Sequence, residues 1–178
     1  MFMPNPKREP KHTSYIVFFP ALFFMLVFEI MHLPSSISQF RPDFVSLLVI
    51  YFATNDPLRV NVGMAWISGL LLDLLSGAPL GFNALALAFQ VYVIAVRFSH
   101  FNAFMIWQQM IIIGLVNFIS YVGVYWLSHM LGQANYSPSF GWYALVTMFI
   151  WPVIWCIFRL LWTACNVSSA SEREEKEI

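Results

Sequence analysis

The stretch GMAWISGLLLDLLSGAPLGFN, residues 63–83, contains the most unusual choices in the chain. Its helical part is apolar or small except for one carboxylate, Asp73, and a glycine stands four residues to either side of it, Gly69 and Gly77. Residues four apart lie on one side of a helix, so these three share a smooth face, with Ser76 close by. A carboxylate within an apolar run costs about 3 kcal/mol on insertion scales, so it needs a partner inside the protein.

Two interpretations of this face remain open. In the first, Gly69 and Gly77 allow close helix packing, and Asp73 hydrogen bonds to a neighbouring segment. In the second, Gly69, Asp73, Ser76 and Gly77 form a binding site for a ligand or a partner protein. The two interpretations can hold together.

The composition places this face in a membrane. Of the 178 residues, 60% are hydrophobic and only 10% are charged, which is far from the composition of soluble domains. We therefore expect an all-α integral membrane protein with one domain. Cys156 and Cys165 point to nearly opposite faces of one helix and cannot pair there. The sequence shows no metal-ligand cluster, activated nucleophile or phosphate loop, so it predicts no enzyme, metal, cofactor or nucleic-acid partner.

Apolar runs predict a six-helix transmembrane bundle over residues 15–162. The runs cover residues 15–33, 44–54, 62–76, 80–98, 104–131 and 140–162. A polar N-terminal segment, 1–14, precedes the bundle, and a polar C-terminal tail, 163–178, follows it. At ~1.5 Å per residue, the second run reaches only about half of the hydrocarbon core. The second and third runs are either two short crossing helices or one re-entrant hairpin, and the crossing helices are favoured.

Basic residues predict the orientation, because cytoplasmic segments are rich in lysine and arginine. With six crossings and both termini cytoplasmic, the outer side of the membrane receives only Arg41. The inner side receives Lys7, Arg8, Lys11, Arg59, Arg97, Arg159, Arg173 and Lys176. We therefore expect a multi-pass protein of the cytoplasmic (inner) membrane.

Arg41 is the cation that this topology places beside the outer-side carboxylates. An intramembrane acid tends to pair with a nearby arginine, so we expect Asp73 to pair with Arg41 or, failing that, to hydrogen bond to a loop amide. The alternative is that Arg41 is a solvated loop residue. Glu29, near the end of the first span, receives no predicted role.

Polar side chains within the fifth span have two interpretations. Asn117 and Ser120 lie near one another on that helix, and Gln108 and Gln109 lie nearer its inner end. Amides within spans hydrogen bond to adjacent helices, which favours stabilisation of the core. An interface with a single-span partner is the other interpretation.

Several strings together resemble the MreD family of rod shape-determining proteins. They cover residues 40–159 in the order and spacing of the family. They are FRPDFVSLLVIYF at 40–52, P-x-RVNVG at 57–63, GLLLDLLSGAPLG at 69–81, WQQ at 107–109, and Trp151-Pro152 with Arg159 seven residues on. The glycine–aspartate string is the most specific of these.

The resemblance implies a non-enzymatic subunit of the bacterial cell-elongation complex, embedded in membrane lipid. Proteins of this family are thought to bind MreC, a bitopic protein. Through MreC they work with the actin-like MreB, the RodA polymerase and a class B penicillin-binding transpeptidase in lateral peptidoglycan synthesis. The fold is likened to the substrate-binding membrane subunits of vitamin uptake transporters, an analogy that transfers no substrate.

Two functions of different classes follow. A scaffold that binds MreC and helps maintain cell shape should present a lipid-facing groove of small residues. A substrate-binding subunit of a small-molecule uptake transporter should instead present a polar pocket. Few polar residues fall at mid-membrane depth, which favours the scaffold, with the partner helix expected near Gly69 and Gly77.

Overall fold

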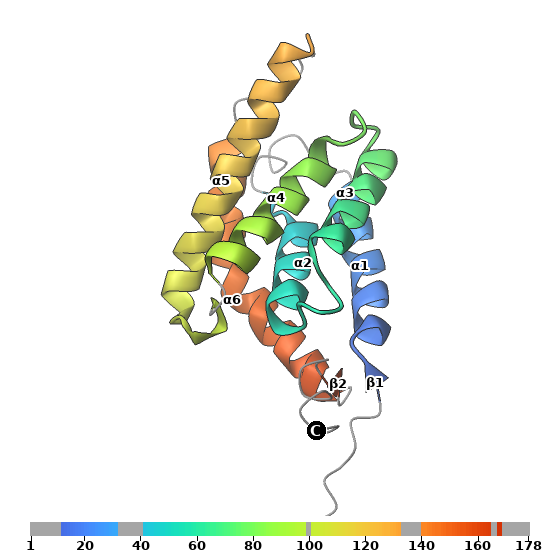
Figure 1. Cartoon of the computed structure of the whole chain (residues 1–178), viewed down its shortest axis with the longest axis vertical. Coiled ribbons are helices and arrows are strands. Elements are labelled where there is room, and N and C mark those ends of the chain that lie inside the picture. Colours follow the sequence, from blue (N-terminus) through green and yellow to red (C-terminus); the bar gives the residue numbers. More distant parts are fainter. Residues whose placement is uncertain (1–11, 32–40, 99–100, 133–139, 165–166, 169–178) are drawn as a thin grey trace, which may run out of the picture.

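A computed structural model describes residues 12–31, 41–98, 101–132, 140–164 and 167–168. These residues form six α-helices, one 3-10 turn and one pair of parallel two-residue strands (Figure 1). The helices are α1 (Tyr15–Ile30), α2 (Phe44–Asn55), α3 (Val62–Ser76), α4 (Phe82–Arg97), α5 (Ile106–Met130) and α6 (Phe140–Ala164). The turn is η2 (Phe101–Ala103), and the strands are β1 (His12–Thr13) and β2 (Val167–Ser168). The predicted all-helical bundle is confirmed, and every predicted helix boundary lies within three residues of the observed one.

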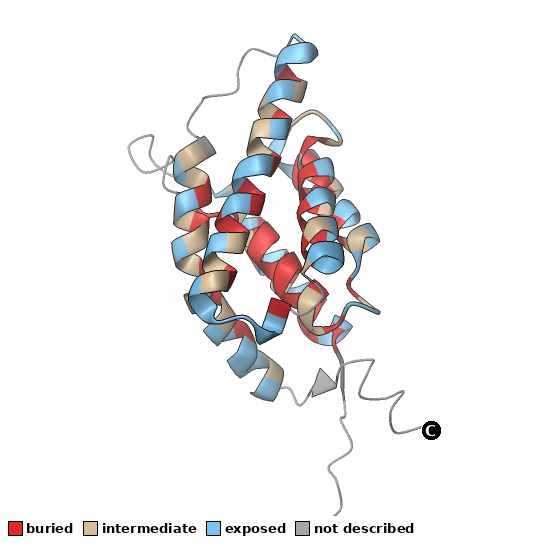
Figure 2. Cartoon of the chain, turned by 60° about the vertical axis from the view of Figure 1, so that its left-hand side comes forward, coloured by how far each residue is buried: buried red, intermediate tan, exposed pale blue. Residues whose placement is uncertain are grey.

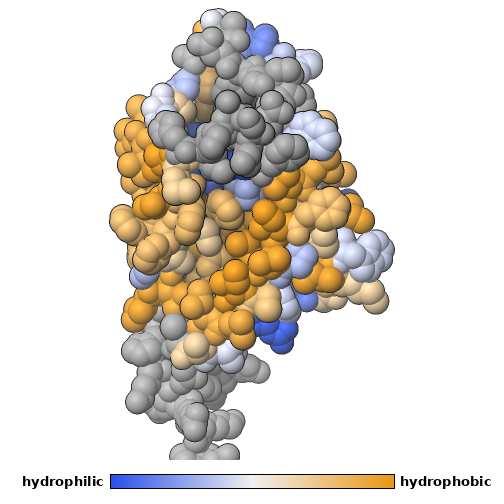
Figure 3. Space-filling view, turned by 180° about the vertical axis from the view of Figure 1, so that it is seen from behind, coloured by the Kyte–Doolittle hydropathy of each residue, from blue (hydrophilic) through white to orange (hydrophobic). Residues whose placement is uncertain are grey.

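Helices α5 and α6 are the two that are long and apolar enough to cross a membrane among the described residues. Each has 25 residues, which corresponds to about 37 Å of helix. Only 28% of the most apolar part of each helix is buried, whereas a core helix of a soluble protein would be mostly buried. The surface seen in Figure 3 is accordingly hydrophobic over most of its middle part. Helices α1 to α4 are shorter, with 12 to 16 residues.

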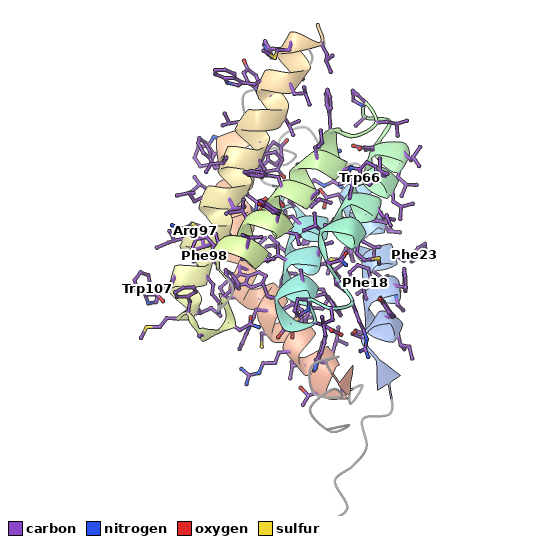
Figure 4. All side chains as sticks on the ribbon, viewed as in Figure 1. Phe18, Phe23, Trp66, Arg97, Phe98 and Trp107 are labelled. Atoms are coloured by element: carbon purple, nitrogen blue, oxygen red, sulfur yellow. The ribbon has the colours of Figure 1, made fainter. Side chains whose placement is uncertain are left out.

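Helix α2 is the centre of the bundle. It contacts α1, α3, α4 and α6, and every residue from Val45 to Ala53 is buried (Figure 2). Its sequence is apolar on all sides, as expected for a helix without a solvent or lipid face. Helix α1 packs against it through Phe18, whose ring lies 5.3 Å from the ring of Phe52, while Phe23 points away from the bundle (Figure 4).

Helices α3 and α4 form the closest helix pair of the fold. A Cβ atom on Gly69 would lie 2.3 Å from the Cα atom of Ala84, so a side chain at this position would collide with the backbone of α4. The connection between the helices turns at Gly77 and Gly81, whose φ angles are +68° and +100°. Glycine adopts such positive φ values without steric cost. The interpretation of Gly69 as a packing residue is confirmed.

We predict that Gly69→Ala destabilises the protein by about 1–3 kcal/mol, because the added methyl group must displace the backbone of α4. Gly123→Ala in α5 is the matched control, since no heavy atom lies within 4 Å of a Cβ atom at that glycine. The control variant should be neutral or more stable, because alanine favours a helix. Thermal unfolding of both purified variants in detergent checks this. Equal stability of the two variants would contradict the packing role.

Candidate functional site

Asp73 caps the N-terminus of α4. Its carboxylate accepts hydrogen bonds from the backbone N–H groups of Gly81 (2.8 Å), Asn83 (3.0 Å) and Ala84 (3.4 Å). The first turn of a helix has N–H groups without intrahelical partners and carries partial positive charge, so it favours a carboxylate. Asp73 is fully buried, and these three bonds replace the water that it loses. The acid therefore joins α3 to the start of α4.

The packing of α3 against α4 buries two of the four residues of the predicted partner-binding face and leaves the other two exposed. Gly69 and Asp73 are buried against α4 and are not available to a partner. Ser76 and Gly77 lie on the surface, where the Ser76 hydroxyl donates to the carbonyl of Leu72 (2.6 Å) and Gly77 ends α3 in a left-handed conformation. Of the four residues suggested for partner binding, Ser76 and Gly77 are therefore the two that are accessible in this structure.

The predicted ion pair between Arg41 and Asp73 is also not formed. Arg41 Nε lies 3.8 Å from a carboxylate oxygen of Glu29, and another nitrogen of its guanidinium donates to the carbonyl of Phe28 (2.8 Å). The Asp73 carboxylate already accepts hydrogen bonds from three backbone amides of the loop and of α4. This arrangement corresponds to the second alternative given above, a hydrogen bond to a loop amide. The sequence could not favour Glu29 as the partner, because sequence separation does not show which acid faces the arginine.

Polar groups from four helices converge on the N-terminus of α2. The Asp43 carboxylate accepts from the N–H of Ser46 (2.9 Å) and from the hydroxyl of Tyr121 in α5 (2.9 Å), and its own N–H donates to Thr147 in α6 (3.0 Å). Glu29 of α1 accepts from the N–H of Phe44 (3.0 Å). Burial raises the pKa of the Asp43 carboxyl above its ordinary value, while the bonds from Ser46 and Tyr121 act in the opposite direction. This end of α2 is thereby fixed to α1, α5 and α6.

A second polar cluster lies at the C-terminus of α2. Asp56 is buried, accepts a hydrogen bond from the hydroxyl of Ser14, and pairs with Arg59 (3.2 Å). The hydroxyl of Tyr15 donates to the carbonyl of Arg59 (3.2 Å). Helix α2 is thus held by a carboxylate at each end.

A buried polar layer joins α2, α4 and α5 between these ends. The Ser46 hydroxyl donates to Gln90 Oε1 (2.5 Å), and Gln90 Nε2 donates to Asn117 Oδ1 (3.3 Å). Asn117 also donates to the carbonyl of Ile113 (3.1 Å). Asn117 therefore serves the core, in agreement with the first interpretation of the fifth span. Gln90 was not predicted, although an amide in the middle of the apolar run of α4 is a signal that could have identified it.

The other polar residues of the fifth span also bond within the protein. Gln109 accepts a hydrogen bond from the indole N–H of Trp151 in α6 (3.0 Å) and donates to the carbonyl of Phe104 (3.0 Å). Gln108 accepts from the N–H of Met105 (3.1 Å), and Ser120 donates to the carbonyl of Val116 (2.8 Å). Among the described residues, no group of three or more histidine, cysteine or acidic side chains could hold a metal ion.

An apolar groove of about 410 Å³ opens between α4 and α5. It lies along the first half of α4 and the second half of α5, where α5 diverges from α4 (Figure 1). Its lining residues are Leu85, Ala86, Phe89, Ile119, Ser120, Gly123, Val124 and Leu127. We call this surface the α4–α5 groove. The spacing of Ser120 and Gly123, two small residues three apart on a helix, is the sequence signal that could have indicated it.

We predict that Arg41 is energetically coupled to Glu29 and not to Asp73. A double-mutant cycle with Arg41→Gln and Glu29→Gln should give a coupling of about 0.5 kcal/mol or more, because the pair is partly shielded from solvent. Glutamine at position 29 keeps an acceptor for the N–H of Phe44 and removes only the charge. The cycle of Arg41→Gln with Asp73→Asn should be additive within about 0.5 kcal/mol. Unfolding in mixed detergent micelles measures both, and a larger coupling to Asp73 would contradict the structure.

Sequence comparison gives the same family as the motifs. The family profile described as rod shape-determining protein MreD matches residues 11–161. A relative from Haemophilus influenzae, the rod shape-determining protein MreD, is 27% identical over 143 residues, which cover 77% of this chain and 86% of the relative. No solved structure matches the chain. Because the profile spans α1 to α5 and nearly all of α6, the chain belongs to the MreD family, whose members are membrane proteins with a role in rod shape determination.

Proposed function

We propose that this protein is a non-enzymatic subunit of the cell-elongation complex and that it binds one transmembrane helix of an MreC-like partner in the α4–α5 groove. The observation that carries the proposal is the groove itself, which is apolar, exposed and lined by the small residues Ala86, Ser120 and Gly123. Through that partner the protein acts with MreB, RodA and a class B penicillin-binding transpeptidase. Its role is to coordinate lateral peptidoglycan synthesis and so to maintain cell shape.

The physics of helix association in lipid supports this choice of surface. Apolar helices gain little from leaving lipid for one another, so association depends on close backbone approach at small residues. Gly123 has open space where a side chain would be, which allows an approaching helix to contact the backbone of α5. Gly69, the glycine favoured from sequence, has its space filled by Ala84. These observations support the α4–α5 groove as the docking surface in preference to the face at Gly69 and Gly77.

The alternative function, a substrate-binding subunit of an uptake transporter, requires polar groups that are free to bind a solute. In the polar layer that joins α2, α4 and α5, the buried side chains of Ser46, Gln90 and Asn117 instead hydrogen bond to one another. This arrangement favours the scaffold.

We predict that Gly123→Leu weakens partner binding several-fold while the protein remains folded and inserted. The Cβ atom of the leucine would meet no heavy atom within 4 Å, and the rest of its side chain would occupy space in the groove. Co-purification of the MreC-like partner from membranes measures the loss, and Gly123→Ala, which leaves most of the groove open, is the control. Retention of the partner at the wild-type level by Gly123→Leu would contradict the proposal.

Cysteine crosslinking can locate the partner helix independently. In a variant without Cys156 and Cys165, cysteines in the partner helix should trap a cysteine at Ala86 or Gly123 more efficiently than one at Ser76 or Phe23. Ser76 represents the accessible part of the face predicted from sequence, and Phe23 represents the exposed face of α1. Preferential trapping at Ser76 would contradict the proposal and would indicate that the partner helix docks at the end of α3.

For topology we propose six crossings with both termini cytoplasmic, as the asymmetry of basic residues indicates. Reporter fusions after Asn135 should then report the periplasm, and fusions after Ser171 should report the cytoplasm. A pair of fusions that report the same side would refute this topology.

A further inference from the structure

A second cavity lies at the opposite end of α2 from the Asp43 cluster. It measures about 420 Å³, is open on one side, and is lined by the C-terminal end of α2, the turn η2 and the last turns of α6, near the lower end of the bundle in Figure 1. Its lining includes Tyr51, Asn55, Asn102, Trp155, Arg159 and Trp162. We call it the Arg159 pocket. It shares no lining residue with the α4–α5 groove.

Arg159 supplies a cation that no described carboxylate neutralises. The described residues contain four acids: Glu29 lies beside Arg41, Asp56 pairs with Arg59, and Asp43 and Asp73 accept hydrogen bonds at helix N-termini. The guanidinium carbon of Arg159 lies 4.7 Å from the centre of the Trp155 ring, so the planar cation rests on an aromatic face. Such stacking orients the guanidinium and leaves its N–H groups available to an acceptor.

The rest of the pocket offers neutral donors. The Tyr51 hydroxyl and the Trp162 indole N–H form no hydrogen bond with other described residues, although both side chains line the cavity. The amides of Asn55 and Asn102 donate to carbonyls of α2, at Tyr51 and Thr54, and so hold this wall in place. A cavity with one oriented guanidinium, several N–H and O–H donors and no described carboxylate is suited to an oxyanion.

The position of the pocket narrows the choice of oxyanion. It lies beside the last turns of α6, a helix long enough to cross the bilayer, and therefore at the depth where a membrane changes from acyl chains to headgroups. Tryptophan is enriched at this depth, and the pocket contains two, Trp155 and Trp162. Arginine binds phosphate through two parallel hydrogen bonds, which a lipid phosphate at this height can accept.

We propose that the Arg159 pocket binds the phosphate group of an anionic membrane lipid. Arg159 contacts the phosphate, Tyr51 and Trp162 donate to its remaining oxygens, and the acyl chains follow the apolar surface of α6. The proposal is independent of the partner-binding role and does not require a particular leaflet.

Retention of lipid by the purified protein tests the proposal. Native mass spectrometry in detergent should show bound phosphatidylglycerol in preference to the zwitterionic phosphatidylcholine. Arg159→Gln should reduce the retained phosphatidylglycerol about tenfold, because a charged hydrogen bond to the phosphate is lost. Arg159→Lys should give an intermediate loss, since lysine keeps the charge but not the paired geometry.

Arg97→Gln is the matched control. Arg97 is also an exposed arginine at the end of a helix, and its side chain lies outside the Arg159 pocket (Figure 4). This variant should retain lipid as the wild type does, and thermal unfolding should show that both glutamine variants are folded. An equal loss in both variants would overturn the proposal, because the attraction would then come from the general positive charge.

Two further measurements exclude other occupants. Soluble glycerol phosphate should not raise the thermal stability of the wild type as phosphatidylglycerol does, and equal protection by both would assign the pocket to a soluble phosphate. The polar tail carries Glu172, Glu174, Glu175 and Glu177, which lie outside the described residues. Deletion of residues 172–178 should leave lipid retention unchanged. A large increase that depends on Arg159 would show that the tail is the occupant and overturn the proposal.

Discussion

The fold depends on a helix that is too short for its surroundings. With 12 residues, α2 extends only about 18 Å, and its N-terminus lies inside the bundle, where water cannot satisfy the backbone. Side chains take the place of water. The first N–H groups of α2 bond to Glu29 and Asp43, while Asn102 donates to a carbonyl of its last turn. Glu29, for which the sequence offered no role, is needed because a backbone N–H of the central helix would otherwise lack an acceptor.

The same requirement explains Asp73. Helix α4 also begins inside the fold, and its first N–H groups converge on this carboxylate. Of the two partners expected for this carboxylate, Arg41 or a loop amide, the structure shows backbone amides. Backbone N–H groups are identical in every residue except proline, so a sequence does not reveal where they lack acceptors. The four acids among the described residues, Glu29, Asp43, Asp56 and Asp73, each make a contact at the end of a helix and so have a structural role.

Prediction from the sequence succeeded for features that depend on local chemistry. The helix boundaries follow apolar runs interrupted by proline, asparagine and glycine, and these signals are read directly from the chain. Gly69 was recognisable as a site of close approach, yet the identity of the approaching helix was not, because packing partners depend on the angle between helices. The α4–α5 groove was missed for the same reason. It exists because α5 continues past the point where it leaves α4, a property of two helices that neither sequence segment shows alone.

The distribution of polar groups determines where function can reside. The described carboxylates and the Ser46–Gln90–Asn117 layer hold the bundle together through hydrogen bonds and ion pairs. Two accessible features of the described residues are the apolar α4–α5 groove and the pocket beside Arg159. Tyr121, close to the groove on α5, bonds to the N-terminus of α2, whereas Tyr51 and Asn55 of the Arg159 pocket belong to its C-terminal half. The two surfaces are therefore connected through a helix that is fixed at both ends.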